Sequence, residues 1–184
     1  MDRTSTTTKQ RLFAAAVEEF AAHGIAGART KRIARSAGVN EALLFRYFGN
    51  KQELFSTVYN QLVQQTVDDV PLDPTDLAGY AGALFDYYYD HDQVLRLSVW
   101  ARLERPESAA TLAVQASTEA KTAALKEAQE TGMVSARLAP AELLAIVIQL
   151  SLTGTAASPS LSGDLDRARR RKSIMTAVEA VSAP

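Results

Sequence analysis

The sequence lacks cysteine throughout its 184 residues, which excludes disulfide bonds and thiolate chemistry. It has only two histidines, and neither stands at metal-ligand spacing from a second histidine or cysteine. Asp86, Asp90 and Asp92 beside His91 offer a metal-dependent enzyme as a remote alternative, but only Asp86 and Asp90 share a helical face. Nucleophile-elbow, P-loop and dinucleotide-binding motifs are absent as well. The sequence therefore predicts neither an enzyme nor a bound metal or cofactor.

Long hydrophobic runs are also scarce. The first residues contain no apolar core of the kind that a signal peptide needs. Residues 143–163 carry no charge, but this stretch becomes rich in Ser, Thr, Gly and Pro after about ten residues. That pattern predicts a buried helix followed by a loop, not a membrane span. We therefore expect a cytoplasmic protein that does not contact a membrane.

Charge is unevenly distributed, although the formal net charge is only -1. Residues 1–52 hold nine basic and four acidic residues, whereas residues 53–184 hold eleven basic and seventeen acidic residues. A basic N-terminal part on an acidic remainder indicates a polyanionic partner for the N-terminal part alone.

The hydrophobic spacing is helical nearly everywhere and predicts an all-α fold of about nine helices. Asn50 and Glu53 have the spacing of a capping box, and Asp73 before Pro74 is typical of a helix start. The segment at 70–76 is the clearest boundary. The expected divisions are residues 1–50, a connecting helix at 51–70 and residues 71–184. The first expected helix ends near Gly24, two short helices cover about 30–36 and 40–47, and a long fourth helix follows Asn50. Five more are expected at about 74–90, 92–103, 106–130, 140–157 and 163–181.

A helix-turn-helix pattern lies within residues 30–48. Two helices that cross steeply need a small residue at their contact and a glycine in their turn. Ala34 and Gly38 meet these needs, while Val39 and Leu44 would fill the wedge between the helices. The spacing is a weak signal by itself, and ordinary helix packing is the alternative.

Three cations surround the start of the expected helix at 30–36. The helix macrodipole disfavours Lys31 and Arg32 in the first turn, and Arg29 stands just before it. Such a cluster becomes favourable when a phosphate docks on the free N–H groups of the helix. A solvated basic surface is the alternative for these residues.

Residues 8–58 resemble the DNA-binding domain of the tetracycline-repressor (TetR) family of bacterial transcriptional regulators. The resemblance rests on Ala37-Gly38-Val39, on the Ile33-Ala34 pair and on the "LFRYFGNK" block at 44–51. It implies a helical C-terminal domain that binds a small-molecule effector and forms a homodimer. The protein would then be a ligand-responsive regulator of transcription, most simply a repressor of a near-palindromic operator in double-stranded DNA. The alternative is an architectural or dimeric DNA-binding protein without an effector.

The resemblance also implies roles for individual residues. Leu44 and Phe48 would be buried, and Lys51 would meet a phosphate. The family usually has Tyr where Phe45 stands and often Ser or Thr where Leu43 stands, so the base sequence that is read should differ from the family's norm. The residues expected to contact DNA are Arg29, Thr30, Lys31, Asn40, Glu41, Ala42, Leu43, Phe45, Arg46, Tyr47 and Lys51.

Two further sets of functional residues are expected in the C-terminal part, one for effector binding and one for the dimer interface. The first combines aromatic area with a few polar groups, as ligand sites do, and the second gives two helices apolar flanks that could form a four-helix bundle between protomers. The basic run at 167–172 is read as solvated surface or as salt bridges at a dimer edge. The effector candidates are Phe85, Tyr88, Tyr89, Arg96, Trp100, Glu104 and Gln149, and the dimer candidates are Leu143, Ile146, Val147, Leu150, Gly154, Ile174 and Val178.

Overall fold

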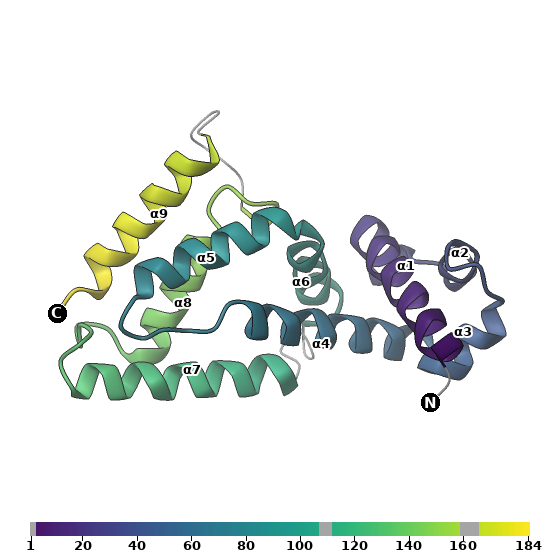
Figure 1. The fold of residues 1–184 in the computed structure, drawn as a ribbon, viewed down its shortest axis with the longest axis horizontal. Coiled ribbons are helices and arrows are strands. Elements are labelled where there is room, and N and C mark those ends of the chain that lie inside the picture. The colour runs from purple at the N-terminus through teal and green to yellow at the C-terminus, as the bar shows by residue number, and fades with distance from the viewer. Residues whose placement is uncertain (1–2, 107–111, 159–165) are drawn as a thin grey trace. The chain divides into compact units, whose positions relative to one another are not determined.

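The computed structural model describes residues 3–106, 112–158 and 166–184, and these contain nine α-helices and no strand (Figure 1). The predicted all-α class is therefore confirmed. None of the described helices is long and apolar enough to cross a membrane. The helices are α1 (Arg3–Gly27), α2 (Thr30–Ser36), α3 (Glu41–Phe48), α4 (Lys51–Asp69), α5 (Leu77–Asp90), α6 (Asp92–Glu104), α7 (Leu112–Glu130), α8 (Pro140–Ser151) and α9 (Arg167–Ser182).

The first of two compact units comprises residues 1–63 and 93–111. Its core joins α1, α2, α3, the first part of α4 and most of α6. Phe20 and Phe55 meet edge to face with ring centroids 5.1 Å apart, a favoured aromatic geometry. Leu97 and Ala101 of α6 are buried in the same core, so this helix is an integral part of the unit that contains the helix-turn-helix.

The second unit comprises residues 64–92 and 112–184. Helix α5 packs against both α8 and α9, and α7 packs against α8. Phe85, Leu143 and Val147 are fully buried in its core. The sequence-based division at residues 50 and 70 concerns function, and it stays a prediction.

Several helix ends differ from the sequence-based expectations. The fourth helix begins as predicted, because the Asn50 side chain accepts N–H bonds from Gln52 and Glu53. The prediction that Asp73 caps α5 is wrong: Asp73 accepts from the backbone and hydroxyl of Thr75 in a tight turn. Asp76 caps α5 instead. Helix α8 ends at Ser151, not at 157, and the predicted helical residues 107–111 and 163–165 lie outside the described part of the chain.

Candidate DNA-binding surface and effector region

The turn between α2 and α3 has the geometry that its sequence predicts. Gly38 adopts a φ of 67°, which favours glycine. The backbone N–H of Val39 returns to the carbonyl of Ala34 at 2.9 Å. Ala34 and Leu44 are buried, so the two helices approach closely through a small residue. The packing predicted for the helix-turn-helix is confirmed.

Helix α3 separates into a core side and an outer side. Leu44 and Phe48 are buried, as predicted, whereas the Phe45 ring is 41% exposed. Tyr47 is half-buried and packs against the core of the first unit. Phe45 is therefore the large apolar side chain of α3 that is presented outward. On the same helix Ala42 and Arg46 are exposed, and Glu41 and Leu43 are half-buried.

Four polar side chains predicted to face DNA also make bonds within the protein: Thr30, Asn40, Glu41 and Lys51. The Asn40 side chain accepts the backbone N–H of Leu43 at 2.8 Å and so caps α3. The Thr30 hydroxyl donates to the Glu41 carboxylate at 2.5 Å and joins the starts of α2 and α3. Arg29, Thr30, Lys31, Glu41, Phe45 and Lys51 line one open hollow together with Ala28.

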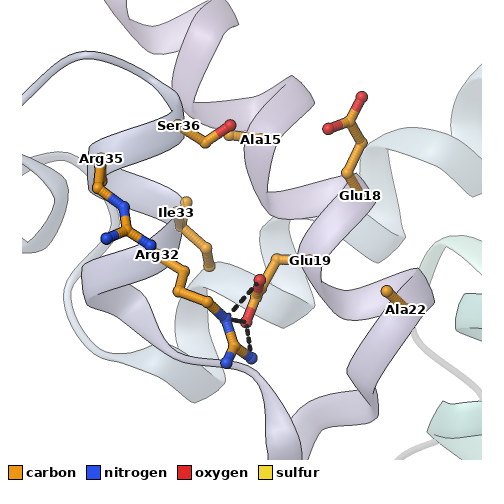
Figure 2. Close-up of a pocket in the computed structure, with 8 residues that line it drawn as sticks. All are labelled: Ala15, Glu18, Glu19, Ala22, Arg32, Ile33, Arg35 and Ser36. Atoms are coloured by element: carbon orange, nitrogen blue, oxygen red, sulfur yellow. Dashed lines mark hydrogen bonds and ion pairs between the residues drawn. The ribbon is translucent and has the colours of Figure 1, made fainter.

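Glu19 of α1 fixes the start of α2, a role that the sequence analysis missed. Its side chain is 10% exposed, and its carboxylate accepts from the Arg32 guanidinium (Figure 2). The same carboxylate accepts the backbone N–H of Arg29. Arg32 also donates to the Gly27 carbonyl. Its inclusion in the phosphate cluster is therefore corrected: Arg32 is engaged inside the protein, which leaves Arg29 and Lys31. No local signal in the sequence marks this role, because Glu19 bonds to residues 10 and 13 positions away.

Replacing Glu19 by glutamine is expected to lower the free energy of unfolding at pH 7 by about 1.5–3 kcal/mol, the range for hydrogen bonds to a charged group. Burial acts to raise the pKa of Glu19, but the bonds from Arg32 and Arg29 outweigh it and hold the pKa below its usual value. A depressed carboxyl pKa stabilises the fold above about pH 4.3 and loses that effect on acidification. Urea unfolding from pH 3 to 7 should show the variant and the wild type converging at low pH. The exposed neighbour Glu18→Gln is the matched control, and an equal loss there would refute the assignment.

The effector candidates do not lie in one place. Trp100 and Glu104 belong to the first unit, where Glu104 accepts backbone N–H bonds from Ile25 and Ala26. In the second unit, Phe85 is buried and its ring lies 5.8 Å from that of Tyr89. Of the remaining candidates, Tyr88 is half-buried, while Arg96 and Gln149 are exposed. Their contact with an effector stays a prediction.

Tyr80 and Lys121 are polar groups of the second unit that the sequence analysis did not single out. Within the described residues the buried Tyr80 hydroxyl has no hydrogen-bond partner. The Lys121 ammonium lies 5.5 Å from the Tyr80 ring centroid. Burial raises the pKa of Tyr80 and lowers the pKa of Lys121, because both charged forms are poorly hydrated there. In the sequence, the helical spacing of Leu77, Tyr80 and Leu84 is typical of a core face and does not distinguish Tyr80 as a binding residue.

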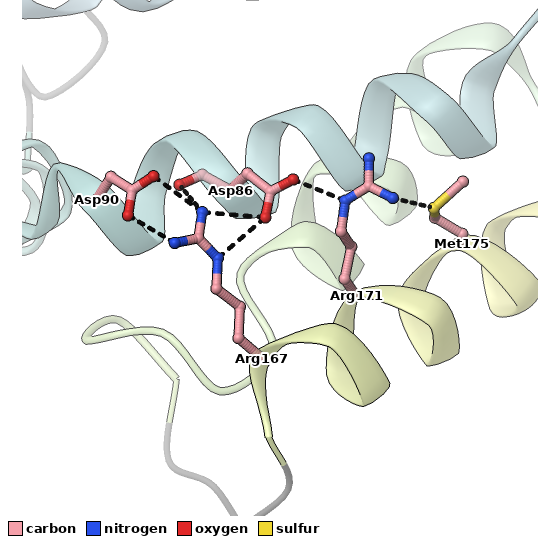
Figure 3. A network of polar contacts seen from close by, with 5 residues as sticks. All are labelled: Asp86, Asp90, Arg167, Arg171 and Met175. Atoms are coloured by element: carbon pink, nitrogen blue, oxygen red, sulfur yellow. Dashed lines mark hydrogen bonds and ion pairs between the residues drawn. The ribbon is translucent and has the colours of Figure 1, made fainter.

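The basic run at 167–172 divides between its two predicted roles: Arg169 and Lys172 are exposed, as expected for a solvated surface, whereas Arg167 and Arg171 form salt bridges. Arg167 pairs with Asp86 and Asp90 at 3.1 and 2.7 Å, and Arg171 pairs with Asp86 at 2.6 Å (Figure 3). These bonds join α9 to α5 within one protomer. Asp86 and Asp90, weighed above as metal ligands, are thus the partners of these arginines.

The dimer candidates are narrowed by burial. Leu143, Val147, Ile174 and Val178 lie in the core of the second unit. A side chain with almost no exposed area in one protomer has none left to bury against another, so these four are corrected from interface to core. Ile146, Leu150 and Gly154 are half-buried and remain the predicted interface residues.

Comparison with known proteins places these features in context. Residues 12–58 match the family model described as "Bacterial regulatory proteins, tetR family". Residues 76–180 match the model of the "Tetracyclin repressor-like, C-terminal domain". The chain is 38% identical over 148 residues to the HTH-type transcriptional repressor SCO4008 of Streptomyces coelicolor. The aligned region covers 78% of this chain and 76% of that protein.

Solved structures agree with this grouping. The crystal structure of the transcriptional regulator SCO4942 from Streptomyces coelicolor matches with a TM-score of 0.85 and 36% identity, over 95% of this chain and 98% of that one. The transcriptional regulator FadR from Bacillus subtilis, crystallised with stearoyl-CoA, has the same fold at a TM-score of 0.68 and 16% identity, over 92% and 97% of the two chains.

Proposed function

Because the chain belongs to the tetracycline-repressor family of helix-turn-helix DNA-binding regulators, we propose that it represses transcription as a homodimer on a near-palindromic operator. A small-molecule effector releases it. It acts in the cytoplasm, where bacterial DNA lies. Repression is supported by SCO4008, a relative described as a repressor.

The observation that carries the proposal is the division of α3 into a buried side, Leu44 and Phe48, and an outer side with Phe45 and Arg46. Arg46 and the cations before and within α2 would neutralise phosphates. Glu41 and Leu43 would face the base edges, where a carboxylate accepts from the cytosine amino group and an apolar side chain contacts a thymine methyl. A two-fold dimer would place two such helices in successive major grooves, about 34 Å apart.

The effector half of the proposal is supported by Tyr80 and Lys121. A buried hydroxyl without a partner costs free energy that a bound acceptor would recover. The poorly hydrated ammonium beside the same ring favours an electron-rich group there. In this scheme the effector binds the state with low DNA affinity more tightly, which is the requirement for any ligand that shifts an equilibrium.

Tyr80→Phe is expected to raise the free energy of unfolding by about 1 kcal/mol, because it removes a buried group that makes no hydrogen bond. It should also weaken release by an effector about tenfold, if one hydrogen bond of about 1.4 kcal/mol is lost. Tyr59→Phe is the matched control, since the Tyr59 hydroxyl bonds to Ser98 at 3.4 Å and its removal brings no gain in stability. A stability loss in Tyr80→Phe would show that the hydroxyl is satisfied in solution.

The whole proposal is tested by selecting bound sequences from random duplex DNA and then screening compounds that release the protein from them. An enriched inverted repeat and a releasing compound are expected. An enriched repeat that no compound releases would favour an effector-independent DNA-binding protein. Failure to enrich any motif at moderate salt would refute specific regulation, and a monomer at micromolar concentration would refute the homodimer.

A further inference from the structure

A short turn of helix, residues 24–28, lies between the main part of α1 and the predicted phosphate-contacting residues 29–31. We call it the Gly24 turn. Gly24 has a φ of 68° and a ψ of -174°, so the helical backbone breaks there and resumes at once. The N–H of Ala28 returns to the Gly24 carbonyl at 3.2 Å. After such a break the first N–H groups of the new turn have no intrahelical acceptor.

Glu104 at the end of α6 supplies that acceptor. Its two carboxylate oxygens accept the backbone N–H of Ile25 at 3.1 Å and of Ala26 at 2.6 Å. One helical turn earlier, the Trp100 indole donates to the carbonyl of Ala21 at 3.3 Å. Helix α6 therefore bonds to the backbone on both sides of the break.

Lys51 at the start of α4 holds the other end of the Gly24 turn. Its ammonium donates to the carbonyls of Ala26 and Ala28 at 3.1 and 3.2 Å. A carboxylate at the amino end and an ammonium at the carboxyl end is the arrangement that peptide dipoles favour. The next residue, Arg29, is fixed by its N–H bond to Glu19 at 2.8 Å.

We propose that Glu104 is a positioning residue for DNA binding, although it lies in the segment that matches the C-terminal domain model. By fixing the Gly24 turn from its amino end, it sets where Arg29, Thr30 and Lys31 meet the phosphates. This inference rests on the proposed DNA binding. It differs from the effector role that the sequence suggested, because it requires Glu104 to act when no effector is present.

The sign of the effect separates this role from general electrostatics. Removing a negative charge from a DNA-binding protein should strengthen binding to polyanionic DNA. If Glu104 positions the phosphate-contacting residues, its removal must instead weaken binding. The loss should appear on every DNA sequence, because phosphate contacts carry no base information.

The experiment titrates full-length Glu104→Gln and Glu104→Ala with a duplex that the wild type enriches and with a duplex of unrelated sequence, at several salt concentrations. We expect about threefold weaker binding for Gln, which keeps one acceptor, and about tenfold for Ala, on both duplexes and with a lower salt slope. The control is Glu119→Gln, an exposed glutamate of α7 with the same change of charge. Its binding should be unchanged or slightly stronger.

Amide hydrogen exchange of Ile25 and Ala26 gives a readout that does not depend on DNA. Both amides should be protected in the wild type and should exchange at least tenfold faster in Glu104→Ala, while core amides keep their protection. Unchanged protection, or affinity equal to that of Glu119→Gln, would overturn the proposal. If the wild type bound neither duplex, the proposed function would fail, and the exchange data would still decide how the turn is held.

Discussion

Replacing Gly24 by alanine is expected to destabilise the protein by about 2–6 kcal/mol. With a φ of 68° and a ψ of -174°, Gly24 occupies a backbone region that is essentially restricted to glycine, and an L-residue there costs about 1–3 kcal/mol. A Cβ at this position would also stand 2.8 Å from Cε3 of Trp100 and inside contact distance of the Glu104 carboxylate. Relieving that overlap costs a further ~1–3 kcal/mol.

Urea unfolding followed by the fluorescence of Trp100, the chain's single tryptophan, measures this loss. The matched control is Gly27→Ala in the same turn. Gly27 has an ordinary φ, and a Cβ there would meet only the Cβ of His23 at 3.4 Å. Alanine is the better helix former, so Gly27→Ala should stabilise by about 0.5–1 kcal/mol. Equal effects of the two substitutions would contradict the conformation assigned to Gly24.

Features set by neighbours in the sequence were predictable. The spacing of Ala34, Gly38 and Leu44 gave the helix-turn-helix, because a small contact residue and a left-handed turn are local requirements. The capping of α4 by Asn50 followed from the same kind of short-range rule. The start of α5 was not predictable in this way, because an aspartate can either cap a helix or stabilise a turn. Here the Asp73 carboxylate accepts from Thr75 in a turn.

Features set by contacts between distant residues were not predictable. Asp86 and Arg167 are 81 positions apart, and the sequence suggested two unrelated roles for what is one ion-pair network. Glu104 reaches Ile25 over 79 positions, so an aromatic-rich segment was read as a ligand site when part of it supports α1. Hydrophobic periodicity says which face of α6 is buried, but not which unit buries it.

Truncating two adjacent residues of α3 to alanine should have two different effects, one on stability and one on DNA affinity. Leu44→Ala should lower the free energy of unfolding by about 2–5 kcal/mol, because Leu44 is fully buried and alanine leaves a cavity. Phe45→Ala should cost only about 1 kcal/mol, clearly less than Leu44→Ala, since Phe45 is 41% exposed. Its effect should fall on DNA affinity, with a loss of about tenfold, equal to ~1.4 kcal/mol.

Urea unfolding and DNA titration of the same two variants test this separation. Phe45→Tyr is the informative partner, since the added hydroxyl places a donor where a phosphate is expected and should tighten binding a few-fold without a change in stability. If Phe45→Ala destabilised the protein as much as Leu44→Ala and left DNA affinity unchanged, Phe45 would be a core residue. The outer side of α3 would then consist of Ala42 and Arg46 with the half-buried Glu41 and Leu43, and sequence reading would rest on Glu41 and Leu43.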